Sequence, residues 1–283
     1  MTDVLPKDFA RALGEPSVAT RLSRFTQRLT YCDVVESTND VAMDLLDSGA
    51  PDGTTVLAST QTAGRGRRGR SWFSPERAGL YLSVVIRDLE SVPITLLAGV
   101  VAAEGIRAVT EVPVELEWPN DLVVQPDESS PAWPRRKKVG GILAEGVSDR
   151  AGHGAVVVGI GVNVNSMGYP PEIAARASSL EAVSGRKIDR GVVMAGILLS
   201  LARWSDKCRT AGGMTMLLRW RELSPSSQGS RVLWASATGD RTGVTDGIDS
   251  DGALRVRFGE QRERVLGGEL VWLPEPTLDS SED

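Results

Sequence analysis

The sequence is poor in the residues that build disulfide frameworks, zinc sites and histidine-dependent catalysts. Its two cysteines, Cys32 and Cys208, are far apart and in no metal-ligand spacing. This disfavours a disulfide-stapled fold or a zinc centre and fits a reduced, cytoplasmic protein. The one histidine, His153, lies in a glycine-rich stretch and is interpreted as a solvated loop residue. A serine–histidine hydrolase would depend on that residue alone, so this class is disfavoured.

Long apolar runs and a surplus of positive charge are also missing. Nowhere do about eighteen apolar residues follow one another, and polar residues such as Asp3, Lys7 and Arg11 interrupt the N-terminus. We therefore expect neither a membrane span nor a signal peptide. The formal net charge of the 283 residues is -5, which argues against a chain built mainly to coat nucleic acid.

Periodicity and turn residues divide the chain into a larger mixed part and a smaller β-rich part. Residues 1–30 have weak periodicity and are predicted to form a loosely packed helical lead-in. Over residues 31–225 the pattern predicts an α+β domain with a mixed sheet and flanking helices. After Pro225, short strands between Gly-Asp, Asp-Gly and Gly-Gly turns predict a small barrel-like β domain over residues 226–273. The acidic residues 274–283 are predicted to be disordered.

The expected elements of the larger part follow from hydrophobic spacing and turn signals. A helix is predicted after the capping residues Ser37-Thr38-Asn39-Asp40, with Gly49 as its stop. Residues 125–136, with three prolines, are interpreted as an exposed loop. The other predicted strands cover residues 31–35, 54–60, 80–87, 114–118, 139–147 and 155–164, and the other predicted helices cover 94–109, 174–180, 192–211 and 215–223. The predicted strands of the smaller part are 231–235, 241–247, 254–258, 264–266 and 270–273.

The most informative stretch is the Gly/Arg loop between two of these strands, from Gln61 to Trp72. It places four arginines within six positions, separated by glycines: Arg65, Arg67, Arg68 and Arg70. Glycines let backbone N–H groups approach an anion, and guanidinium groups hold phosphate or carboxylate oxygens by bidentate hydrogen bonds. The same composition is typical of a solvated basic loop or an RNA-binding segment. The position between strong strands of an acidic chain favours a ligand site, with Trp72 either in the core or covering an adenine or an acyl-adenylate.

Three further segments carry candidate binding residues. Lys138 enters a strand just before Gly140 and Gly141, where paired glycines often mark close approach of a ligand, although a strand-start lysine is also commonly solvated. Gly159 and Gly161 lack the third glycine of a dinucleotide motif, so we expect them to flatten a strand beneath a bound ring, with Asn163 reading an adenine edge. The sequence Trp118-Pro119-Asn120-Asp121 predicts a turn, with Asp121 a candidate metal residue near a phosphate.

Taken together and in this order, these segments resemble the biotin–protein ligase family over roughly residues 35–273. The resemblance implies a catalytic domain related to class II aminoacyl-tRNA synthetases and an SH3-like C-terminal domain. It implies an enzyme that uses ATP and Mg2+ to convert biotin to biotinyl-5′-AMP with release of pyrophosphate. Biotin is then transferred to a lysine of a biotin carboxyl carrier domain of a biotin-dependent carboxylase.

The resemblance also implies roles for individual residues. Lys138, Arg65 and Arg67 would act in catalysis, with Gly267-Gly268-Glu269 of the last domain near the nucleotide. The implied biotin-binding residues are Ser37, Thr38, Asn39, Gln61, Gly64, Arg65, Gly66, Arg67, Lys138, Gly141 and Gly159. The implied ATP-binding residues are Arg67, Arg68, Arg70, Trp72, Asn120 and Asn163.

The sequence departs from the family pattern in three places. Glu117 precedes Trp118-Pro119-Asn120-Asp121 where the family has a lysine, and Arg136 or Lys137 is expected to compensate. Residues 125–136 look like an insertion, and no DNA-binding N-terminal domain is evident, so DNA binding is not expected. The competing hypotheses are a lipoate–protein ligase, which shares fold and chemistry, and a non-catalytic RNA-binding protein that uses the arginine loop.

Overall fold

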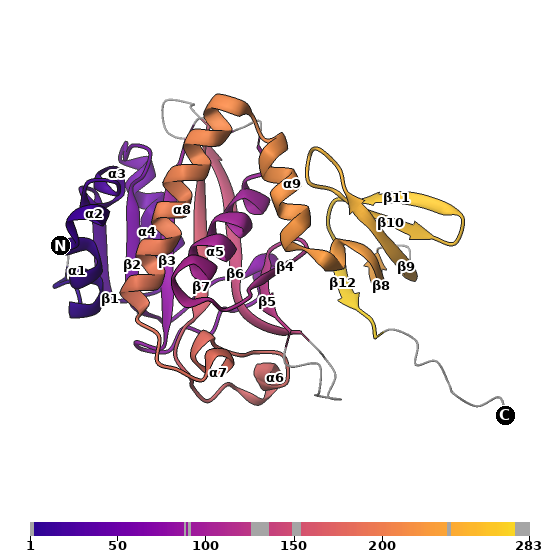
Figure 1. Ribbon diagram of the computed structural model, residues 1–283, viewed down its shortest axis with the longest axis horizontal. Helices are drawn as coiled ribbons and strands as arrows, with labels where there is room; N and C mark the ends of the chain where they lie inside the picture. The colour runs from indigo at the N-terminus through magenta and orange to yellow at the C-terminus, as the bar shows by residue number, and fades with distance from the viewer. Residues whose placement is uncertain are drawn as a thin grey trace.

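The computed structural model describes residues 3–87, 89, 92–125, 136–148, 154–236 and 239–274, which form a larger mixed sheet beside a smaller antiparallel one (Figure 1). The larger sheet has seven strands, of which the first two are parallel and the other neighbours antiparallel. In spatial order they are β1 (Leu29–Val35), β2 (Thr55–Gln61), β3 (Gly79–Ile86), β7 (Gly154–Asn163), β6 (Lys137–Ser148), β5 (Asp121–Val124) and β4 (Glu115–Glu117). The prediction of an α+β fold with a mixed sheet is confirmed.

Helices cover both faces of this sheet. The long helices α5 (Ile94–Thr110) and α8 (Arg190–Ala211) lie on one face, as Figure 1 shows. Neighbouring residues of β3 belong to different hydrophobic clusters: Val84 joins the main core with these helices, and Val85 joins a second cluster with Ala42 and Leu46 of α4 (Thr38–Asp47). Because successive strand residues point to opposite faces, α4 covers the opposite face.

The N-terminal residues are helical, as predicted, but the prediction of loose packing is wrong. They form α1 (Lys7–Gly14), α2 (Pro16–Ala19) and α3 (Ser23–Thr26). Phe9, Leu22 and Phe25 are buried in the main core, and Asp8 pairs with Arg190 of α8 at 2.8 Å. The large apolar residues among the charges were enough to anchor the segment, although their spacing gave a weak periodic signal.

The helix predicted over residues 174–180 is also wrong. The structure has two short helices, α6 (Pro171–Ala174) and α7 (Leu180–Ser184), joined by a turn and a short segment that contains a β-bridge. Ala177 in that segment pairs with Lys138 of β6, where the Lys138 N–H donates to the Arg176 carbonyl at 2.7 Å. Ser179 then starts α7 by accepting a hydrogen bond from the Ala182 N–H.

After α9 (Met214–Leu223) and the short turn η2 (Pro225–Ser227), the chain forms a five-stranded antiparallel sheet. Its strands are β8 (Gln228–Ser236), β9 (Gly239–Ile248), β10 (Leu254–Phe258), β11 (Gln261–Val265) and β12 (Glu269–Trp272), in the order β11-β10-β9-β8-β12. Val232, Leu254 and Val265 belong to the same core cluster as the larger sheet. The Trp118 indole N–H donates to the Gly252 carbonyl at 3.0 Å and links the two sheets.

Three predictions lie wholly or mostly outside the described residues: the loop position of His153, the exposed loop at 125–136 and the disordered tail at 274–283. Among the helices that are described, none has the length and apolar character needed to cross a lipid bilayer.

Candidate active site

The Gly/Arg loop connects β2 to β3 and is folded as a small hairpin. The Trp72 N–H donates to the Gly64 carbonyl at 2.8 Å, and the Gly66 N–H donates to the Arg70 carbonyl at 2.7 Å. Arg68 at the tip has a φ of 59°, in the left-handed region. Gly64 is needed at the base, because a Cβ there would lie 2.6 Å from the Trp72 carbonyl oxygen.

Trp72 lies across two strands of the larger sheet, where glycines leave room for it. A Cβ on Gly161 of β7 would lie 2.5 Å from the indole Nε1, and one on Gly141 of β6 would lie 3.4 Å from Cζ3. Gly161 thus lies beneath a ring, which is the protein's own indole, while Gly159 faces Asn39. A bound ring over these two glycines stays a prediction. The Trp72 Nε1 is buried and has no hydrogen-bond partner among the residues that are described.

Beside the loop lies a polar floor, defined here as the buried Thr38, Asn39 and Ser83 together with the partly buried Gln61. The Gln61 Oε1 accepts from the Thr38 N–H at 2.8 Å, and the Ser83 hydroxyl lies 2.6 Å from the Asn39 Oδ1. Ser37 occupies the N-cap position of α4, but its side chain makes no capping hydrogen bond, so the predicted capping role of Ser37 is wrong. The Gln61 side chain satisfies the first helical N–H instead.

Gly159 of β7 makes room for this floor. A Cβ on Gly159 would lie 2.4 Å from the Asn39 Oδ1. Ser83 is not among the predicted site residues, although a hydroxyl residue in the otherwise apolar stretch 80–86 was a usable signal.

Arg65, Arg67 and Arg70 of the loop contact different partners. The Arg67 Nη1 donates to the Asn120 Oδ1 at 3.3 Å, and burial, followed by the nearby charge of Arg68, lowers the pKa of Arg67. Arg70 pairs with Glu269 of β12, which brings the predicted C-terminal glutamate to the loop.

Arg65 is held differently. Its Nη2 lies 2.7 Å from an oxygen of Asp40 and 2.8 Å from one of Glu145. The predicted contact of Arg65 with a ligand carboxylate stays a prediction.

Lys138 and Asn163 lie at the strands beside Trp72. The Lys138 ammonium is 2.6 Å from the Asp121 carboxylate and 5.4 Å from the centre of the Trp72 ring. Asn163 is buried, and its Nδ2 donates to the Ser178 carbonyl at 3.0 Å. The loop, floor, Lys138, Asn120 and Asn163 therefore gather at one region, which the order of the sequence motifs alone did not specify.

Glu117 shows how the chain accommodates its departure from the family pattern. Its Oε2 lies 3.4 Å from the Arg136 Nη1, so the two side chains form an ion pair. The Lys137 ammonium donates to the Ala175 carbonyl. Compensation for the family's lysine by Arg136 or Lys137 stays a prediction. Burial, followed by the charge of Asp121, raises the pKa of Glu117 to about 7.

The side chains around Asp121 do not fit a resident magnesium site. The Asp121 carboxylate is already engaged by the Lys138 ammonium, and the described part of the chain holds no cluster of three His, Cys, Asp or Glu residues suited to a metal. Mg2+ prefers carboxylates and phosphate oxygens without a competing ammonium.

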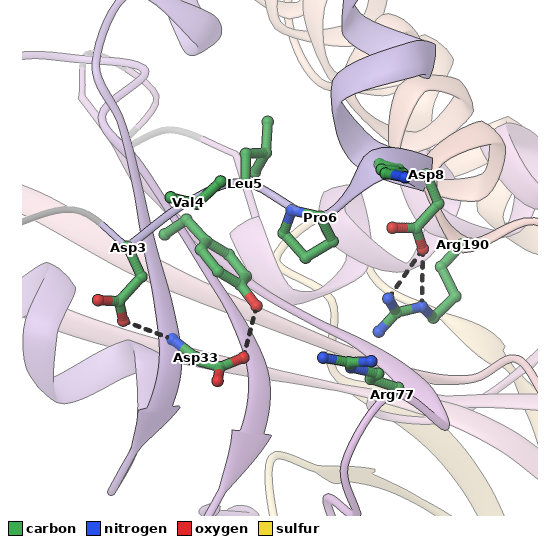
Figure 2. Close-up of a pocket in the computed structure, with 10 residues that line it drawn as sticks. Asp3, Val4, Leu5, Pro6, Asp8, Asp33, Arg77 and Arg190 are labelled. Atoms are coloured by element: carbon green, nitrogen blue, oxygen red, sulfur yellow. Dashed lines mark hydrogen bonds and ion pairs between the residues drawn. The ribbon is translucent and has the colours of Figure 1, made fainter.

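A separate pocket of about 690 Å³ lies by the N-terminal segment (Figure 2). It is lined in part by Asp3, Asp8, Asp33, Arg77 and Arg190, and none of its lining residues was predicted as a site residue. The predicted site is therefore an assembled surface beside the Gly/Arg loop and is distinct from this cavity.

The comparisons with known proteins agree with this arrangement. A model of the Biotin/lipoate A/B protein ligase family matches residues 31–163, which contain every predicted site residue of the larger part. Bifunctional ligase/repressor BirA of Bacillus spizizenii is 34% identical over 250 residues, covering 86% of this chain and 74% of that protein. Biotin--[acetyl-CoA-carboxylase] ligase of Mycobacterium tuberculosis is 31% identical over 285 residues, covering 92% of this chain and 96% of that protein.

A solved structure has a similar fold. The biotin protein ligase from Aquifex aeolicus in complex with biotin and ATP superposes with a TM-score of 0.72 and 28% identity, over 88% of this chain and 99% of that one. The chain belongs to the Biotin/lipoate A/B protein ligase family.

Proposed function

We propose that this chain is a biotin–protein ligase. It activates biotin with ATP to biotinyl-5′-AMP, releases pyrophosphate, and transfers biotin to a lysine of a carrier domain. The observation that carries the proposal is the Gly/Arg hairpin, closed beside the polar floor and seated on β6 and β7 through Trp72. Relatives named as biotin ligases that match across the hairpin and floor support it.

The polar floor suits the ureido end of biotin. A urea group presents two N–H donors and one carbonyl acceptor. Thr38, Asn39 and Gln61 offer donor and acceptor groups within one cluster, in which Thr38 and Asn39 are buried and Gln61 is partly buried. Ser37, also buried, lies next to them at the start of α4. Exchange of their mutual hydrogen bonds for bonds to biotin would leave no buried polar group unpaired.

The cations suit the activation step. The biotin carboxylate oxygen attacks the α-phosphorus of ATP and the bond to pyrophosphate breaks. At 4 Å the two anions repel by about 4 kcal/mol for an effective dielectric near 20. Arg67 and Lys138 would offset this repulsion, since Lys138 lies beside Trp72 and Arg67 reaches Asn120 from near the tip of the hairpin, with Arg68 and Arg70 next to it. The Lys138 ammonium would exchange part of its contact with Asp121 for the new anion.

Trp72, Asn120 and Asn163 would contact the nucleotide, and Glu269 would approach it through Arg70. The fold is then of the class II aminoacyl-tRNA synthetase type, with an SH3-like C-terminal barrel. Mg2+ would arrive bound to the phosphates of ATP, because Asp121 is already paired.

The second step uses the adenylate as an acyl donor. The nitrogen of the acceptor lysine attacks the carbonyl carbon, the bond to AMP breaks, and an amide forms. The closed hairpin would exclude water, which otherwise hydrolyses the mixed anhydride. The acceptor would be the carrier domain of a biotin-dependent carboxylase in the cytoplasm, a compartment that suits the two free thiols of Cys32 and Cys208.

The test is a direct ligation assay. The protein is incubated with ATP, Mg2+, biotin and a biotin carboxyl carrier domain, and the carrier is then weighed by mass spectrometry. We expect the mass gain of one biotin amide per acceptor lysine. No gain from folded protein refutes the proposal.

Exchange of labelled pyrophosphate into ATP distinguishes a biotin–protein ligase from a lipoate–protein ligase. Exchange that depends on biotin and does not occur with lipoate is the expected result. Exchange with lipoate instead would identify a lipoate–protein ligase.

A further inference from the structure

Two acidic residues outside the predicted site hold the Gly/Arg loop. The Arg65 Nη2 lies 2.7 Å from the Asp40 Oδ1 and 2.8 Å from the Glu145 Oε2. Asp40 belongs to α4 and Glu145 to β6, so one loop side chain is bound from two different elements. Opening the loop would break both contacts and leave two carboxylates facing each other without a cation.

The Arg65 contact continues into the polar floor. The Glu145 Oε2 that binds Arg65 also accepts from the Asn39 Nδ2 at 2.7 Å. At the other end, the Gln61 Nε2 donates to the Ser74 hydroxyl at 2.8 Å, and that hydroxyl donates to the Trp72 carbonyl at 3.2 Å. A continuous series of polar contacts thus runs from one end of the loop to the other through Arg65, Glu145, Asn39, Ser83, Thr38, Gln61, Ser74 and Trp72.

The strength of the Arg65 contacts suits a reversible closure. The side chains of Arg65, Asp40 and Glu145 are 37%, 48% and 25% exposed. Ion pairs at such exposure shift an equilibrium by about fivefold or less each. Two of them bias the loop toward the closed form, while biotin can still enter and product can still leave.

We propose that Asp40 and Glu145 are positioning residues, which hold the Gly/Arg loop closed through Arg65 and so retain the adenylate until the acceptor lysine arrives. This inference rests on the proposed ligase function. It assigns the Arg65 guanidinium to closing the loop. It also makes Glu145 the residue that connects occupancy of the floor, through Asn39, to loop closure.

The test compares Asp40→Asn and Glu145→Gln with wild type. Both changes keep the side-chain shape and remove one charge, and Asp40 is half-exposed, so the fold is retained. Asp44→Asn is the matched control, an exposed aspartate one turn further along α4. Asp40→Glu restores the carboxylate at the same position.

The measured quantity is the hydrolysis of biotinyl-AMP to biotin and AMP without a carrier domain, set against the rate of ligation with it. We expect hydrolysis about fivefold faster in Asp40→Asn and in Glu145→Gln, and wild-type behaviour in Asp44→Asn. Asp40→Glu should retain the adenylate almost as well as wild type. An unspecific loss of structure would lower both rates together and would not be rescued by glutamate.

The positioning role is overturned if the wild-type protein ligates biotin and both Asp40→Asn and Glu145→Gln retain the adenylate as well as it does. The ligase function would still stand in that case. If wild type forms no adenylate at all, the ligase function itself fails.

Discussion

Lys138 lies where a ligand anion would compete for its ammonium, between the Asp121 carboxylate and the face of the Trp72 ring. Replacing Lys138 with alanine should lower kcat/KM for biotin by about 10- to 100-fold, the range expected for a lost charge-assisted hydrogen bond. The free energy of unfolding should change by less than about 1 kcal/mol, since the ion pair is partly exposed.

Steady-state ligation kinetics and urea unfolding measure the two quantities. Lys137→Ala is the control, because the Lys137 ammonium contacts the Ala175 carbonyl instead. Unchanged kinetics in Lys138→Ala would remove this residue from the site.

A substitution at Gly161 tests whether activity requires the packing of the Trp72 ring on β7. In Gly161→Ala the new Cβ would lie 2.5 Å from the indole Nε1, so the ring must move. We expect the free energy of unfolding to fall by about 1–3 kcal/mol and kcat/KM to fall by about tenfold or more. Gly146→Ala, in β6 and without a neighbour within 4 Å of the added Cβ, should behave as wild type. Equal activity of the two variants would show that the closed indole is dispensable.

Glu117 should make stability depend on pH. Its pKa is about 7 in the folded protein, raised from 4.5 chiefly by burial. Between these values the folded state keeps a proton that the unfolded state releases, so the free energy of unfolding falls as the pH rises and levels off above pH 7. Glu117→Gln should remove this component and stabilise the protein at pH 8 by up to about 3 kcal/mol, with no gain at pH 4.

Urea unfolding across pH 4–8, with the exposed Glu260→Gln as control, measures the difference. A constant offset between wild type and Glu117→Gln at every pH would show that folding does not shift the pKa of Glu117.

Among the elements, the Gly/Arg loop is the one whose mobility should depend on ligand. Its contacts to the rest of the protein are mainly Arg65, Arg67, Arg70 and the Trp72 seat, and several of these side chains are exposed. We expect trypsin to cleave within residues 64–72 readily in the empty protein and slowly with biotin plus ATP. Cleavage sites elsewhere in the chain serve as internal controls. Equal rates with and without ligand would contradict the expected ordering.

The elements that could be predicted from sequence are those whose own residues decide their burial. β3 is buried along its whole length, and α5 is apolar on most sides, so a mainly apolar run marked each of them. The error at residues 174–180 has a different origin. The backbone there pairs with Lys138 of β6, and that partner is distant in the sequence.

The candidate site also has a part that could be predicted from the sequence and a part that could not. The arginines, glycines and Lys138 could be predicted because their residue types carry the chemistry of anion binding. The partners of those residues could not. Asp40 and Glu145 meet Arg65 only after the chain folds, since Glu145 lies 80 positions away from it. Likewise, the sequence indicated that something flat lies on Gly161, but only the structure identified it as Trp72.

At the scale of the whole molecule, the two sheets share one hydrophobic core. Residues of β8, β10 and β11 belong to the same cluster as α5 and α8, so we expect one cooperative unfolding transition. Leu254→Ala, at a fully buried position of β10, should cost about 2–5 kcal/mol and shift that single transition. Leu218→Ala, at a half-exposed position, should shift it little.

Far-ultraviolet circular dichroism and tryptophan fluorescence should report the same midpoint for the transition. Two separate midpoints would show that the smaller sheet unfolds independently. The division of the chain into residues 31–225 and 226–273 stays a prediction.

The ends of the Gly/Arg loop leave from β2 and return to β3, which are paired neighbours in one sheet. Their separation is set by the strand spacing of roughly 5 Å, whatever lies between them. The loop is therefore an exchangeable cassette, because its length and composition can change without altering the register of any strand. Changes in this connection can therefore alter the arginines that face the anions, while the floor, which comes from α4, β2 and β3, keeps its geometry.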